Sequence, residues 1–108
     1  MAKSTDPRKT RAYKDLRQSI RDDLDAAGKV SRIHDDMLDL YMSLWVDLQN
    51  FQTDIAQRGV VVMDEKRAQL VENRSVSLKL QVSREMRAVY AELTKPDPGG
   101  GGGEDDEL

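Results

Sequence analysis

The chain has 108 residues, of which 38% are hydrophobic and 34% charged, with a net charge of −3 and no cysteine. This length allows one domain at most, and the lack of cysteine excludes disulfides, a thiolate metal site and a cysteine nucleophile. No stretch approaches the roughly 20 apolar residues that cross a membrane, and the first residues lack a signal-peptide core. We therefore expect a soluble intracellular protein that contacts no membrane.

The charge is strongly polarised along the chain. Residues 1–21 contain seven Lys and Arg against two Asp, a balance of +5, whereas residues 95–108 contain one Lys against five acidic residues, a balance of −4. We expect a flexible basic arm at 1–12, a helical domain at 13–94 and a disordered, glycine-rich acidic tail at 95–108. The tail is either a solubilising tether or a peptide that docks on a basic partner or competes with DNA for the arm.

The first predicted helix begins near Tyr13 and ends at Gly28, because apolar residues recur at helical spacing and glycine commonly ends helices. The arm and the first half of this helix gather basic residues, which form either a solvated face or a surface that contacts DNA phosphates. The candidate DNA-binding residues are Lys3, Arg8, Lys9, Arg11, Lys14, Arg17 and Arg21. The short link at 28–30 predicts that the first two helices fold back on each other as a hairpin.

The chain is organised around a long helix expected at 31–59, with Ser31 as its N-cap and Gly59 at its end. Steps of four and three residues keep one apolar stripe on a single face of this helix. The stripe consists of Met37, Tyr41, Leu44, Leu48, Phe51 and Ile55, and Ile33 extends it backwards.

After Gly59, a β-branched run at 60–63, a polar turn at 64–66 and a return at 69–71 predict a small β-hairpin or an extended loop. A lone hairpin is marginal in water, so we expect it to lie on the helices or to pair with a neighbouring subunit. Residues 74–93 alternate like a strand at first, but the helical pattern is longer and predicts a helix capped by Asn73 or Ser75. The predicted fold class is mainly α, with a helical hairpin, this β-hairpin or loop, and a C-terminal helix.

Several apolar residues lie outside the main stripes, and so small a core favours oligomerisation. We expect these residues to be buried between subunits. The candidate oligomer interface consists of Leu38 and Trp45 on the central helix and Val76 and Leu80 on the last helix.

No pattern of catalytic or metal-ligating residues is present, so we expect no enzyme activity, no cofactor and no metal site. His34 is the only histidine and has no ligand partner at metal-site spacing. The adjacent pairs Asp22-Asp23 and Asp35-Asp36 splay apart on a helix. The five glycines at 99–103 lack the Lys-Ser/Thr of a phosphate-binding loop.

The order of elements resembles the small terminase subunit of tailed bacteriophages, in the P27-like family, over about residues 13–93. The resemblance rests on Tyr41 and Trp45 in the central helix, the Arg58-Gly59 break followed by valines, Glu72-Asn73, and the apolar pattern of the last helix. The chain departs from the family at Arg74, where proline is usual. It departs again after Lys95, where members commonly carry a short segment with Leu-Gly, Pro and Arg or Ser.

The resemblance implies a DNA-recognition protein for genome packaging in the cytoplasm of the infected bacterial host. Small terminase subunits assemble into rings, bind double-stranded viral DNA, and recruit and regulate the large terminase subunit, which holds the ATPase and nuclease. The residues alone leave two alternatives: a small helical DNA-binding transcriptional regulator or antitoxin, and a structural helical adaptor that binds no DNA.

Overall fold

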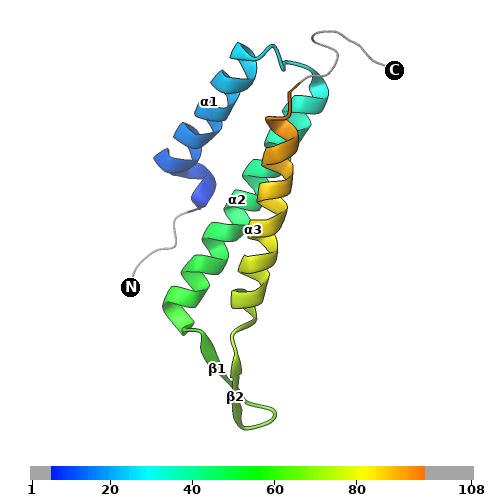
Figure 1. Cartoon of the computed structure of the whole chain (residues 1–108). Coiled ribbons are helices and arrows are strands. Elements are labelled where there is room, and N and C mark those ends of the chain that lie inside the picture. Colours follow the sequence, from blue (N-terminus) through cyan, green and yellow to red (C-terminus); the bar gives the residue numbers. More distant parts are fainter. Residues whose placement is uncertain (1–5, 97–108) are drawn as a thin grey trace, which may run out of the picture.

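A computed structural model describes residues 6–96 of the chain, so Lys3 and the acidic tip of the tail lie outside the described residues. The elements in order are a short 3-10 helix η1 (Pro7–Lys9), α1 (Arg11–Ala26), α2 (Arg32–Arg58), β1 (Val61–Asp64), β2 (Gln69–Glu72) and α3 (Arg74–Leu93). Figure 1 shows α1 folded back beside one half of α2, while α3 runs antiparallel to α2 along most of its length. The predicted fold, mainly α with a small hairpin, is confirmed.

The ends of α2 follow from local capping. The Ser31 hydroxyl accepts a hydrogen bond from the backbone N–H of His34, and Asp35 in the first turn suits the positive end of the helix dipole. Arg58 lies in the last turn, and Gly59 follows with φ of 88°, a backbone angle that side-chain-bearing residues rarely adopt. The predicted helix at 31–59 is therefore confirmed to within a residue at each end.

Two adjoining apolar clusters, which share the half-buried side chains of Tyr41 and Val89, pack both α1 and α3 against α2. The first joins Leu38 of α2 to α1 and to Leu93 at the end of α3. The second joins Leu44 of α2 to Val82 and Met86 of α3. This two-sided packing explains why α2 needs an apolar surface wider than a two-helix seam.

The N-terminal part of the described chain has more regular structure than the sequence predicted. Residues 7–9 form η1, and α1 begins at Arg11, within the range expected to be a flexible arm. Two short-range caps explain this start. The carboxylate of Asp6 accepts a hydrogen bond from the backbone N–H of Arg8, and the Thr10 hydroxyl accepts one from the backbone N–H of Tyr13. The link at 27–31 then turns the chain back, which gives the predicted hairpin of α1 and α2.

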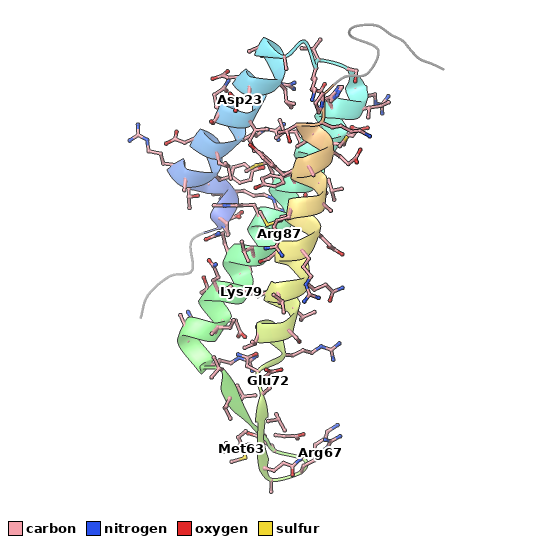
Figure 2. The ribbon with its side chains drawn as sticks, in the orientation of Figure 1. Asp23, Met63, Arg67, Glu72, Lys79 and Arg87 are labelled. Atoms are coloured by element: carbon pink, nitrogen blue, oxygen red, sulfur yellow. The ribbon has the colours of Figure 1, made fainter. Side chains whose placement is uncertain are left out.

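The predicted β-hairpin is present, with β1 antiparallel to β2 and Val61 opposite Glu72. The carboxylate of Asp64 accepts hydrogen bonds from the backbone N–H groups of Lys66 and Arg67, at 3.0 and 3.3 Å, and thereby stabilises the turn. The hairpin does not lie on the helices. It projects past the ends of α2 and α3, with Arg67 at its far end (Figures 1 and 2). Pairing with a neighbouring subunit stays a prediction.

Residues 74–93 are a helix, as the longer of the two patterns predicted. Val82, Met86 and Leu93 recur at helical spacing and are buried, whereas Leu80 of the alternating pattern is exposed. The side chain of Asn73 caps this helix by accepting a hydrogen bond from the backbone N–H of Ser75 at 2.9 Å.

Candidate nucleic-acid and assembly surfaces

Four of the predicted DNA-binding side chains are exposed on η1 and the first turns of α1. They are Arg8, Lys9, Arg11 and Lys14. Within residues 6–96, the only ion pair among these four joins Arg11 to Asp15 at 4.0 Å, between two exposed side chains. Such a pair contributes little to stability, so all four cations are available to a phosphate backbone.

The other two described candidates, Arg17 and Arg21, connect α1 to α2. A guanidinium nitrogen of Arg17 lies 2.8 Å from the Asp39 carboxylate. Arg21 lies 3.3 Å from Asp25, donates to the Asp35 carboxylate and donates to a backbone carbonyl at 3.4 Å.

The pKa of Arg21 is raised, chiefly by its hydrogen bond to Asp35, with burial opposing the rise. Its charge is therefore firmly kept and internally compensated. Arg17 and Arg21 pair with carboxylates of α2, whereas the four exposed cations on η1 and the start of α1 form no ion pair with another helix among residues 6–96.

A second set of basic residues lies on α3, at Arg74, Arg84 and Arg87. All three side chains are exposed, and none forms an ion pair within the part of the chain that the structure describes. In Figure 1, α1 and α3 lie on different sides of α2, so the two basic sets belong to separate helices.

The four candidate interface residues occupy different environments. Leu38 is 0% exposed, because α1 covers it, and it has no free surface for a second chain. Trp45 is half-buried, with its ring centroid 5.8 Å from that of Tyr13. Val76 is half-buried and Leu80 is 52% exposed. Of the four, Leu80 offers the clearest apolar surface to a partner.

A network of polar side chains lies at the base of the hairpin. The sequence predicted only that Asn73 or Ser75 caps the last helix, not the other hydrogen bonds of this network. Asn73 is 0% exposed, and its amide nitrogen donates to Asp54 at 3.0 Å and to the carbonyl of Gly59 at 2.8 Å. Asp54 also accepts from the hydroxyl of Ser75 at 2.6 Å and from Arg58, whose Nε lies 2.6 Å away. The network thus joins the end of α2 to the start of α3 and includes three residues on which the family resemblance rests.

This network has a clear electrostatic signature at Asp54. Its pKa is held well below the usual range, first by the hydrogen bonds from Arg58 and then by those from Ser75 and Asn73, with burial acting in the opposite direction. A sequence signal was present only for the Asp54–Arg58 pair, which has the i, i+4 spacing of a helical ion pair.

A buried lysine was also missed. Lys29, in the link between α1 and α2, donates from Nζ to the carbonyl of Leu93 at 2.9 Å and to that of Lys95. These carbonyls lie at the end of α3, where a cation satisfies unpaired acceptors and the negative end of the helix dipole. Lys29 therefore fastens the α1–α2 link to α3.

Residues 6–96 hold no group of three or more His, Cys, Asp and Glu side chains placed to bind a metal ion. His34 is half-buried in the first turn of α2, with Nδ1 2.8 Å from the Ser31 hydroxyl. None of the described helices combines the length and apolar character needed to cross a bilayer.

Most of the chain matches a known protein family. Residues 14–94, more than half of the chain, match the family model described as phage terminase, small subunit. The match does not extend to the P27-like subgroup, which stays an expectation. No curated protein and no solved structure matches the chain significantly.

Proposed function

Because the chain belongs to the phage terminase small-subunit family, we propose that it binds double-stranded viral DNA and recruits and regulates the large terminase subunit during genome packaging. The chemistry of ATP hydrolysis and DNA cleavage then resides in the large subunit, in the cytoplasm of the infected host. The family match favours this role over a transcriptional regulator, an antitoxin or a structural adaptor that binds no DNA.

The observation that carries the DNA-binding part is the set of exposed cations on η1 and the first turns of α1. Arg8, Lys9, Arg11 and Lys14 are exposed on an element whose backbone is held by two caps. Contacts from such side chains to phosphate position a protein on DNA without reading its sequence. In a ring, each weak set of contacts is repeated in every subunit, so the sum supports useful affinity.

The test replaces Arg8, Lys9 and Arg11 by Ala and measures affinity for one duplex in a salt series. We expect weaker binding to all sequences and a smaller salt dependence, by about 0.9 in log–log slope for each phosphate that the variant no longer neutralises. The matched control replaces Arg32, Lys66 and Arg67, three exposed cations on α2 and at the hairpin, and removes the same charge. If the two triple variants lose affinity equally, net charge and not this surface governs binding. An unchanged slope in the first variant moves the DNA surface to Arg74, Arg84 and Arg87.

A further inference from the structure

One exposed stripe on α2 is acidic and carries an exposed leucine. Its residues are Asp36, Leu40, Ser43, Asp47 and Asn50, spaced by four, three, four and three, and all five side chains are exposed. Leu40 is 51% exposed, although it lies in the middle of a helix that packs on two sides. Neither α1 nor α3 covers this stripe, because their contacts use other sides of α2, marked by Leu38 and Leu44.

A matching stripe on α3 is basic and also carries an exposed leucine. Its residues are Ser77, Leu80, Arg84, Arg87 and Ala91, spaced by three, four, three and four, and all five are exposed. Figure 2 shows where Arg87 lies on α3. The stripe excludes Val82 and Met86, which pack against α2.

The two stripes are complementary in pattern and in charge. Alternation of three and four residues is the spacing at which two helices pack along a seam. Within residues 6–96, Asp47, Arg84 and Arg87 form no ion pair, and Asp36 has only a 3.9 Å contact with exposed Arg32. The carboxylates of the α2 stripe and the guanidinium groups of the α3 stripe could therefore neutralise each other across a contact between two copies.

The surface beside the α3 stripe also has room for an apolar side chain. An open groove of about 530 Å³ is lined by Tyr41 and Met86 together with Arg87, Tyr90 and Ala91. Two of these lining residues, Arg87 and Ala91, belong to the stripe itself. An exposed leucine from a neighbouring helix would fit beside the aromatic rings at this groove.

We propose that a second copy of this chain covers the α3 stripe with its α2 stripe. Since the two stripes differ and lie on different helices, the contact is heterologous, and one copy offers both surfaces at once. Repeated contacts of this kind close into a ring when the rotation between copies allows closure. The interface keeps Leu80 from the sequence-based candidates, adds Leu40 and replaces the buried Leu38. DNA is a less suitable occupant, because it would leave the acidic stripe uncovered.

This inference concerns the contact between copies and rests on the proposed function only through the family to which the chain belongs, not through its DNA-binding part. The experiment uses two charge-reversed variants of the full chain, D36K/D47K and R84E/R87E, with oligomer mass read by native mass spectrometry and folding by circular dichroism. We expect the parent to form a closed oligomer and each variant alone to have a lower mass, because like charges then face each other. An equimolar mixture should form oligomers of higher mass than either variant alone, since each contact between unlike variants again joins opposite charges. A ring with an even number of subunits should regain the parental mass.

A control variant, D22K/D23K, reverses two exposed acidic residues on α1, one of them labelled in Figure 2, and should keep the parental mass. Replacing Arg8, Lys9 and Arg11 by Ala should also leave the mass unchanged, which separates assembly from DNA binding. A monomeric parent would overturn both the assembly and this interface. A parental oligomer whose mass neither variant lowers would overturn the interface alone, as would a folded mixture that fails to reassemble. Loss of DNA binding by R84E/R87E at unchanged mass would assign the α3 stripe to DNA and also overturn the interface.

Discussion

The network at the base of the hairpin predicts that Asn73 is among the residues most sensitive to substitution. Replacing Asn73 by Ala removes the N-cap of α3, which typically stabilises a helix by about 0.5–2 kcal/mol. It also removes the amide that donates a hydrogen bond to the Gly59 carbonyl. Because the Asn73 side chain is fully buried, this carbonyl then lacks a donor at a buried position. An unsatisfied buried polar group costs about 1–3 kcal/mol. We therefore expect the free energy of unfolding to fall by about 1.5–5 kcal/mol in Asn73→Ala.

The assay is urea unfolding followed by circular dichroism, with all proteins at one concentration because association adds to apparent stability. Replacing Asn73 by Ser retains a capping oxygen but loses the amide donors to Asp54 and Gly59, so its loss of stability should be intermediate. Gln81→Ala, which removes an exposed amide on the same helix, should change stability by less than about 0.5 kcal/mol. If Asn73→Ala matches this control, the network does not hold the two helices together and the reasoning fails.

Two further predictions concern the apolar core and the loss of stability at low pH. Leu38→Ala should lower the free energy of unfolding by about 2–5 kcal/mol, because it opens a cavity between α1 and α2. Ile33→Ala, at a side chain that is 70% exposed, should have a small effect in the same denaturant titration. Because the pKa of Asp54 is lowered in the folded state, its contribution to stability is present above about pH 4 and is lost as the pH falls below that value. The free energy of unfolding should therefore fall less in Asp54→Asn than in the parent between about pH 5 and pH 3. The control is Asp23→Asn, at an exposed carboxylate on α1, whose free energy of unfolding should change with pH as that of the parent does.

The family assignment could be reached from the sequence because its signals are local. Arg58-Gly59 and Glu72-Asn73 mark the end of one helix and the start of the next, and the structure places both at those boundaries. The β-hairpin between them follows from a β-branched run and a polar turn. These features act within a few residues of the chain, so a pattern of residue types is enough to locate them.

The environment of individual side chains was not predictable in the same way. The sequence pattern placed Leu38 outside the main apolar stripe and therefore in the candidate oligomer interface, yet α1 covers it. Arg17 and Arg21 belonged to a basic set by their charge, yet carboxylates on α2 pair with them. Lys29 gave no sequence signal at all, since its acceptors, the carbonyls of Leu93 and Lys95, are far away along the chain.

The sequence by itself determined the central and last helices, their caps at Ser31 and Asn73, and the turn of the hairpin. Helical periodicity, capping and turn formation depend on residues that are neighbours in the chain. Only the tertiary structure decided which cations remain free and which leucines remain exposed. Those outcomes depend on how each helix is rotated against the next, and that rotation is set by packing among all three helices. Arg84 and Arg21 are the same residue type on similar helices, but Arg84 is free among residues 6–96 while Arg21 is held by Asp25 and Asp35.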